Sequence, residues 1–430
     1  MRMALLLTAL LIAPAVQAQT TAATAAAAAA GEETPLHKRA ADALAVLQGK
    51  QPAEAVFAPS FLQQVSPAQL AEITRQLTTA HGVPTAVERV TPDGPASAAI
   101  AIRFERAVGH GVLAIEPQAP HRITGLLLQR FEAIDDSPAK IEAELRALPG
   151  AVNAWFGPLA GGSPLISVNA DQPLALGSTF KLFVLSTLSR AIERGEHRWD
   201  EVVPLTVRSY PSGVMHLWRQ GSPATLETLA TLMMQISDNT ATDQLIALLG
   251  RARVEAEFRR LVQQGGDRTL PFLTTREFFV IKSDPALRAR YELASEAERR
   301  RMLAELPGQA VPTATVERAF AGSPMSIERI EWFASPAALA GLMRGLSRPQ
   351  ATRAREVLAS ARNLDEATIA RWHYVGFKGG SEPGVLNLTW LLQDQAGSWH
   401  MLSVGWNNPA APVTAPTLQA LANRMLALAR

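Results

Sequence analysis

The 430-residue sequence contains no cysteine. Disulfide bonds, a thiolate nucleophile and a cysteine-bound zinc ion are therefore excluded. The absence does not fix the compartment, because an exported protein can do without disulfides. Charged residues make up only 19% of the chain and the formal net charge is +2, without a basic block of the kind that binds nucleic acid. After the first residues no apolar run is long enough to cross a membrane.

The beginning of the chain has the features of an export signal. Arg2 is followed by an apolar run from Ala4 to Val16, and Val16-Gln17-Ala18 has the pattern of a signal-peptide cleavage site. This pattern predicts a secretory signal peptide at residues 1–18, although a short uncleaved anchor is the alternative. Residues 19–34, mostly alanine and threonine, predict a flexible leader. We expect a protein exported to a Gram-negative periplasm or secreted, without a stable membrane anchor.

Hydrophobic residues make up 47% of the chain, which indicates a globular protein of one to three domains. In residues 35–133, helical periodicity at Leu36–Gln48 and Pro67–Ala80 precedes strand-like segments. The segments are Thr85–Val90, Ala98–Phe104, Val108–Ile115 and His121–Phe131. Gly109-His110-Gly111 has the composition of a turn. The order predicts a small α+β domain. No pair among His81, His110 and His121 has the spacing of a metal site.

A second domain is predicted from residue 137 to residue 430. Ser137 and Pro138 are typical of the start of a helix, which a hairpin follows. A helical block occupies the middle of the domain, and a hairpin and a final helix end it. This order predicts an α+β or α/β fold, in which both ends of the domain form an antiparallel sheet and helices flank it.

A Ser-x-x-Lys pattern opens the apolar helix after the first hairpin of this domain. Ser178 and Lys181 lie three residues apart, so that on a helix they share one face. A serine hydroxyl is a poor nucleophile near neutral pH, but an adjacent lysine with a lowered pKa can take its proton. Taken alone, the pattern also fits an ordinary surface serine and lysine at the start of a core helix.

Two further motifs follow in order, Ser237-Asp238-Asn239 and Lys378-Gly379-Gly380. With Ser178-x-x-Lys181 they resemble the signature of class A β-lactamases and penicillin-binding proteins. The resemblance covers residues 137–430 and implies the fold of the class A β-lactamases and the related DD-peptidases. It also implies a serine hydrolase that needs no metal or cofactor.

The resemblance implies a role for each motif residue. Ser178 becomes acylated, Lys181 takes or holds its proton, and Ser237 relays a proton to the leaving group. Asn239 orients the lysine, and Lys378 attracts a substrate carboxylate. The backbone N–H groups of Ser178 and Ser381 form the oxyanion hole, and Gly379 and Gly380 let the substrate approach the strand closely.

The chain departs from the family pattern at two places. Gly379 stands where the family usually has threonine or serine, so a hydroxyl that helps to hold the substrate carboxylate is missing. The E-x-x-L-N loop that supplies the deacylating base is absent from the corresponding stretch, Leu273–Phe279. Glu277 is a possible base there, but we expect it to pair with Arg276 or another arginine. These departures favour slow deacylation or ester substrates.

A second resemblance comes from the two-domain order, from Thr274–Glu277 and from Lys378–Gly384. It is to the esterase-type proteins of clavulanic acid gene clusters, whose first domain is similar to steroid-isomerase folds. We therefore expect an acyl-enzyme on Ser178 and hydrolysis of a β-lactam amide or an ester. The alternatives are a D-alanyl-D-alanine peptidase or penicillin-binding protein acting on a peptidoglycan-like peptide, and a non-catalytic ligand-binding module. The oligomeric state is left open.

Overall fold

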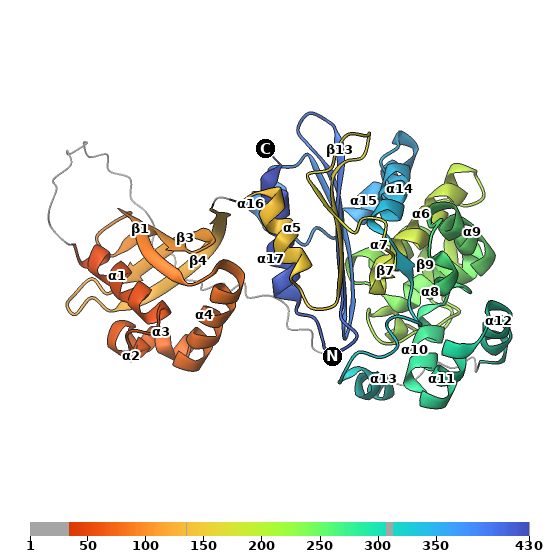
Figure 1. Cartoon of the computed structure of the whole chain (residues 1–430), viewed down its shortest axis with the longest axis horizontal. Coiled ribbons are helices and arrows are strands. Elements are labelled where there is room, and N and C mark those ends of the chain that lie inside the picture. The colour runs from red at the N-terminus through yellow and green to blue at the C-terminus, as the bar shows by residue number, and fades with distance from the viewer. Residues whose placement is uncertain (1–33, 135, 307–312, 430) are drawn as a thin grey trace. The chain divides into compact units, whose positions relative to one another are not determined.

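The computed structural model describes residues 34–134, 136–306 and 313–429. The chain divides into two compact units with the boundary between Asp136 and Ser137 (Figure 1). The expected signal peptide and nearly all of the expected leader lie outside the described residues. Within the described part of the chain, no helix is both long enough and apolar enough to cross a membrane.

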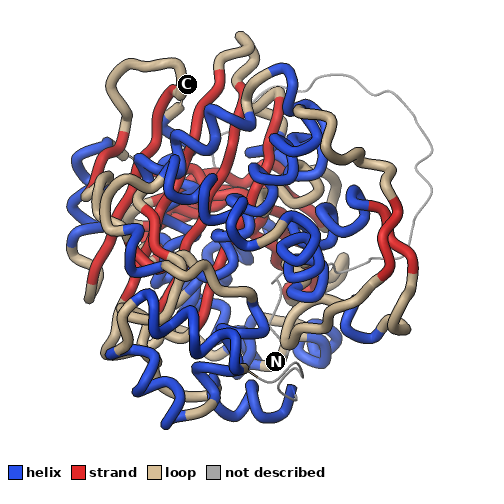
Figure 2. Tube along the Cα trace, turned by 90° about the vertical axis from the view of Figure 1, so that its right-hand side faces the viewer, coloured by secondary structure: helices blue, strands red, loops and turns tan. Residues whose placement is uncertain are grey.

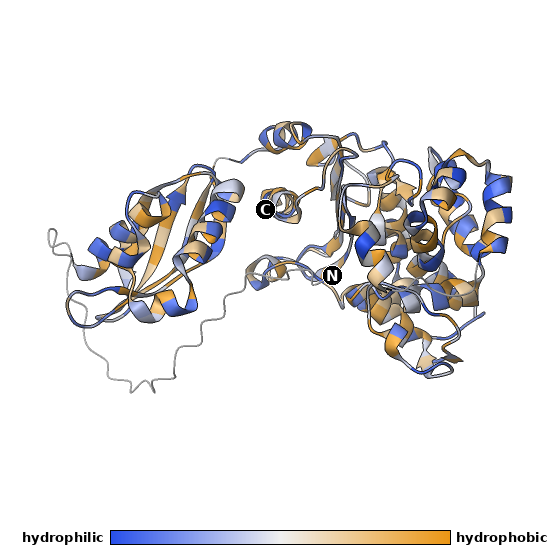
Figure 3. Ribbon diagram, turned by 90° about the horizontal axis from the view of Figure 1, so that it is seen from below, coloured by the Kyte–Doolittle hydropathy of each residue, from blue (hydrophilic) through white to orange (hydrophobic). Residues whose placement is uncertain are grey.

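The described residues of the first unit form four helices and one sheet. The helices are α1 (Pro35–Leu47), α2 (Ala53–Val56), α3 (Pro59–Gln64) and α4 (Pro67–His81). The strands are β1 (Pro84–Pro92), β2 (Ser97–Phe104), β3 (Ala107–Ile115) and β4 (Ile123–Ala133), which pair in sequence order as an antiparallel meander. Ser66 begins α4 with a capping box that it forms with Gln69. The core lies where helices and strands meet, as the colouring in Figure 3 shows.

One expectation for this unit is wrong. Gly109-His110-Gly111 does not form a turn but lies inside β3. The pairing register of β3 with β4 shifts between His110 and Gly111, and a Cβ atom at position 111 would lie 1.8 Å from the carbonyl oxygen of Leu127. The glycine therefore allows a close approach between two strands, which is the second common use of glycine in a strand pattern.

The second unit is built around a five-stranded antiparallel sheet. Its strands are β5 (Ala151–Pro158), β6 (Ile166–Val168), β11 (Tyr374–Glu382), β12 (Val385–Gln393) and β13 (Trp399–Asn407), in the order β11-β12-β13-β5-β6. Short strands form two further pairs, β7 (Leu174–Ala175) with β10 (Phe333–Ala334) and β8 (Val202–Pro204) with β9 (Pro223–Thr225). Strands from both ends of the unit thus share one sheet.

Helices cover both faces of this sheet. On one face lie α5 (Pro138–Arg146) and α17 (Ala415–Leu428), and on the other lie α6 (Lys181–Glu193) and α14 (Pro336–Leu346) (Figure 1). The larger helical layer also includes α7 (Leu226–Gln235), α8 (Asn239–Leu249), α9 (Arg251–Leu261), α10 (Thr275–Ser283), α11 (Pro285–Leu293), α12 (Glu296–Glu305), α13 (Thr313–Phe320) and α15 (Thr352–Leu358), with the short α16 (Glu366–Ile369) elsewhere in the unit. Figure 2 shows helices of this layer in front of the strands. Each face of the sheet has its own apolar core.

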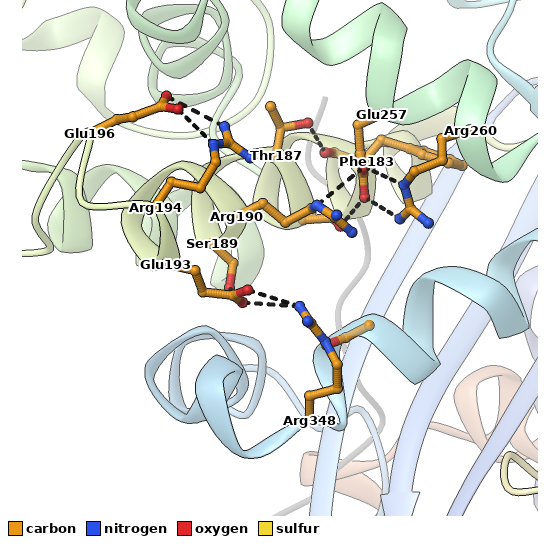
Figure 4. A network of polar contacts seen from close by, with 12 residues as sticks. Phe183, Thr187, Ser189, Arg190, Glu193, Arg194, Glu196, Glu257, Arg260 and Arg348 are labelled. Atoms are coloured by element: carbon orange, nitrogen blue, oxygen red, sulfur yellow. Dashed lines mark hydrogen bonds and ion pairs between the residues drawn. The ribbon is translucent and has the colours of Figure 1, made fainter.

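Helix α6 is the central element of the larger layer, and nearly all of its residues are buried. Polar contacts hold its carboxyl-terminal half (Figure 4). Arg190 of α6 pairs with Glu257 of α9 at 3.7 Å, and Glu193 of α6 pairs with Arg348 at 2.9 Å. The exposed members of this network contribute little to stability, so the position of α6 depends mainly on its packing. The opposite end of the helix carries the first motif.

Candidate active site

Ser178 lies in a single 3-10 turn, Gly177–Phe180, that leads into α6. The α-helix therefore starts at Lys181, three residues later than the sequence pattern indicates. The serine is half-buried, whereas its two neighbours in the turn are buried. The ring of Phe180 stacks on Trp332 at a centroid distance of 3.8 Å, which fixes the turn from behind.

Lys181 is fully buried and its amine contacts the second motif. Its Nζ donates hydrogen bonds to the carbonyl oxygen of Ser237 at 2.6 Å, to Ser237 Oγ at 3.0 Å and to Asn239 Oδ1 at 2.7 Å. Burial, and next the positive charge of Lys378, lower the pKa of Lys181 well below that of an ordinary lysine, although two nearby aspartates oppose the shift. The neutral amine has two N–H groups, so it donates at most two of these three bonds, and its lone pair can then accept a proton near neutral pH.

The second motif sits where α7 ends and α8 begins. Ser237 has a positive φ of 57° and is half-buried. Asp238 caps α8, and its second oxygen accepts hydrogen bonds from the backbone N–H groups of Val214 at 2.6 Å and Met215 at 2.8 Å. The carboxylate therefore attaches the loop before β9 to the motif, a structural role that the sequence analysis did not assign. An acidic residue before an apolar run is an N-cap signal that could have indicated it.

The third motif lies in β11 and its backbone runs against the nucleophile turn. A Cβ atom at Gly380 would lie 2.4 Å from the backbone nitrogen of Ser178, and one at Gly177 would lie 2.6 Å from that of Ser381. The two glycines therefore allow two backbone N–H groups to come together, as an oxyanion hole requires. A Cβ at Gly379 would instead meet the ring of Phe377 at 2.7 Å.

Lys378 points into the same region. Its side chain is buried, and its Nζ donates a hydrogen bond to the carbonyl oxygen of Gly379 at 2.7 Å. Burial lowers the pKa of Lys378 to about 7. The Lys378 charge in turn lowers the pKa of Lys181, so the two lysines share one electrostatic environment. The structure thus brings Ser178, Lys181 and the other predicted motif residues together around one point.

Glu277, the possible base, has both carboxylate oxygens engaged. One accepts a hydrogen bond from the backbone of Thr274 at 2.8 Å in the capping box that begins α10, and the other pairs with Arg251 at 2.5 Å. The arginine partner is Arg251 rather than Arg276. Glu277 lines a cavity of about 600 Å³ together with Tyr210, but none of the five catalytic residues predicted from the motifs is among the residues that line it. This geometry gives Glu277 a helix-capping role.

Asp243 is a buried residue of this region that the sequence analysis missed. It accepts hydrogen bonds from the backbone N–H groups of Thr275 at 2.8 Å and Arg276 at 2.9 Å, and from the hydroxyl of Ser209 at 2.5 Å. Burial raises its pKa despite these bonds. Asp243 thereby attaches the start of α10 to α8, one helical turn after Asn239. An acidic residue on the apolar side of a predicted helix indicates a buried carboxylate with hydrogen-bond donors around it, and this signal could have identified Asp243.

No group of three or more histidine, cysteine, aspartate or glutamate side chains within residues 34–134, 136–306 and 313–429 is arranged to hold a metal ion. Around Ser178 the structure places the residues of the three motifs in the order and contacts described above.

Comparison with known proteins gives the family. Residues 137–362 match the model of the β-lactamase enzyme family, and the chain belongs to this family. No curated protein matches the chain at a significant level. Among solved structures, a β-lactamase from Sphaerobacter thermophilus is 21% identical, with 67% of this chain and 94% of that chain covered and a TM-score of 0.46. PBP-A is 16% identical over 68% and 93%, with a TM-score of 0.46. An ancestral class A β-lactamase is 18% identical over 67% and 96%, with a TM-score of 0.45.

Proposed function

We propose that the protein is an exported serine hydrolase that forms an acyl-enzyme on Ser178 with a small β-lactam or ester. The observation that carries the proposal is the buried amine of Lys181, which is hydrogen-bonded to Ser237 and Asn239 and lies one turn from a half-buried serine. The serine Oγ attacks the substrate carbonyl carbon while Lys181 accepts its proton. Ser237 returns a proton to the leaving nitrogen or oxygen as the bond to it breaks.

The remaining groups bind charge that the substrate brings or develops. The backbone N–H groups of Ser178 and Ser381 stabilise the oxyanion of the tetrahedral intermediate. Lys378 attracts a substrate carboxylate, and Ser381, an exposed residue of the same strand, stands in for the hydroxyl that Gly379 lacks. A substrate with a carboxylate next to its reactive carbonyl fits this arrangement.

The rate of deacylation is expected to differ between β-lactam and ester substrates. Glu277 is committed to Thr274 and Arg251, so it is not free to activate water. The acyl-enzyme from a β-lactam is therefore expected to be long-lived, whereas a simple ester acyl group is turned over. The esterase-type proteins of clavulanic acid gene clusters remain the model for this activity.

A D-alanyl-D-alanine peptidase of the penicillin-binding type is the second candidate, and the engaged carboxylate of Glu277 favours it as well. The lowered pKa of Lys181 argues against a module that merely binds a ligand, because a binding site does not need a proton acceptor beside a serine.

The test is the intact mass of the protein after brief incubation with benzylpenicillin, followed by an assay of the drug in the same tube. We expect an adduct of one drug molecule in the wild type and in Ser163→Ala, which changes an exposed serine, but not in Ser178→Ala. An adduct that survives Ser178→Ala would overturn the mechanism. Consumed drug without an adduct would indicate a true β-lactamase with another base. Intact drug with rapid hydrolysis of an ester would indicate an esterase.

A further inference from the structure

Three ionisable side chains outside the motifs form a buried cluster in the second unit. Lys282 comes from α10, Glu382 from the end of β11, and Glu331 from the segment before β10. The Lys282 ammonium lies 2.5 Å from Glu382 Oε1, and these side chains are 0% and 7% exposed. Glu331 is the carboxyl group next to this ion pair, and the charges of both Glu382 and Lys282 act on it. Glu331 itself is 2% exposed.

The chemistry of the cluster requires a proton between the two carboxyl groups. Two carboxylates can only accept hydrogen bonds, and Glu331 Oε1 has no donor among the described residues. One ammonium balances one carboxylate, so the second carboxyl must be neutral to be buried without great cost. Burial, and next the charge of Glu382, raise the pKa of Glu331 well above its usual range. Burial also raises the pKa of Glu382, but Lys282 opposes that shift, so the proton resides on Glu331.

Each carboxyl group is attached to the backbone beside one donor of the predicted oxyanion hole. Glu331 is attached by a hydrogen bond, and Glu382 by its place in the sequence. The second oxygen of Glu331 accepts hydrogen bonds from the backbone N–H of Gly177 at 3.3 Å and of Trp332 at 2.9 Å. Gly177 immediately precedes Ser178, and Glu382 immediately follows Ser381. The segments also touch directly, because a Cβ at Gly177 would lie 2.6 Å from the nitrogen of Ser381.

We propose that Glu331, Glu382 and Lys282 are positioning residues, which share one proton between the two carboxyl groups and hold the backbone segments of the oxyanion hole in place. The inference rests on the proposed acyl transfer at Ser178. The cluster acts through the peptide groups at 177 and 381 and does not touch the substrate. A buried ion pair of this kind is weak evidence for stability in itself, because well-packed apolar side chains stabilise a fold equally well. Its specific effect is on geometry.

The kinetic test compares Glu331→Gln with Glu331→Leu. Glutamine keeps an acceptor for Gly177 and a donor for Glu382, as the protonated acid does, whereas leucine keeps neither. Loss of a single oxyanion donor typically costs a factor of 10² to 10³ in kcat. Glu331→Leu displaces a donor but does not remove it, so its loss should be smaller. We expect kcat for ester hydrolysis to fall about 10-fold to 100-fold, with a KM within about threefold of wild type. Glu331→Gln should restore the wild-type values, and Glu328→Gln, which changes an exposed glutamate of the same segment, is the control.

A second measurement does not depend on turnover. It follows the unfolding of Ser178→Ala and of Ser178→Ala/Glu331→Gln in denaturant from pH 4 to pH 8, by tryptophan fluorescence. The charged groups that face Glu331 are Glu382 and Lys282. The native protein keeps a proton that the unfolded chain releases above pH of about 4.3. The folding equilibrium constant of the parent should therefore fall with rising pH relative to the glutamine variant, by at most about tenfold per pH unit.

The outcomes separate the two proposals. If the wild type itself fails to acylate at Ser178, the proposed function is wrong and the positioning role fails with it. If the wild type acylates but Glu331→Leu keeps its kcat, or Glu331→Gln loses as much as Glu331→Leu, the positioning role alone is wrong. Equal pH dependence of the two unfolding series would refute the shared proton, whatever the activity.

Discussion

Lys378→Met should stabilise the second unit at neutral pH, although it should harm substrate binding. The Lys378 side chain is 4% exposed, and burial lowers its pKa to about 7. A lysine in the unfolded chain titrates at about 10.4. Below pH 7 both states bind the proton, so the native state carries the full cost of a buried charge. Between pH 7 and about 10.4 only the unfolded state keeps the proton, so the stability of the wild type rises with pH.

The magnitude follows from the difference between the two pKa values. A shift of roughly 3 to 4 units corresponds to about 4 to 5 kcal/mol at 1.36 kcal/mol per unit. The gain of Lys378→Met over the wild type should therefore be largest near pH 6 and shrink by about 1.4 kcal/mol per pH unit above pH 7. Removal of the charge also relieves Lys181, whose pKa Lys378 lowers, and this effect has the same sign.

The assay is denaturant unfolding at pH 6, 7, 8, 9 and 10, monitored by tryptophan fluorescence. All eight tryptophans lie between Trp155 and Trp406, so the signal reports on the second unit alone. Lys140→Met, which changes an exposed lysine of α5, is the matched control and should show no pH-dependent difference from the wild type. A difference between Lys378→Met and the wild type that stays constant from pH 6 to pH 10 would refute the reasoning.

Three further predictions concern the site. Lys181→Arg should lower the acylation rate by a factor of about 10² to 10⁴, because arginine cannot accept the proton. Stopped-flow acylation with benzylpenicillin measures this rate, and an unchanged rate would contradict the prediction. Glu277→Gln should retain turnover but lose about 1 to 3 kcal/mol of unfolding free energy, since it leaves Arg251 poorly paired; abolished turnover with a stable fold would restore Glu277 as the base. Gly380→Ala should abolish acylation, because its Cβ would lie 2.1 Å from the carbonyl oxygen of Leu176, and intact mass after drug treatment measures this.

The elements of both units were predictable to a large extent because their signals are local. Ser137 starts α5 where the pattern indicates, and apolar periodicity marks α4, α6 and α14. The failure at Gly109–Gly111 has a physical reason. A glycine in a turn and a glycine at a strand irregularity have the same sequence signal, and only the pairing partner, Leu127, distinguishes them.

The motif residues could be named from the sequence because their spacing along the chain is short within each motif. The supporting contacts could not, since they join positions far apart in sequence. Lys282 and Glu382 are separated by 100 residues, and Glu331 follows no recognisable motif. What decides their chemistry is burial: the same three side chains in water would be two ordinary carboxylates and an ammonium. Once the fold excludes water, one proton must be retained. The cluster also binds the backbone N–H of Gly177, in the turn that presents Ser178. The motifs therefore identify the reacting atoms, while the tertiary fold determines how firmly these atoms are held.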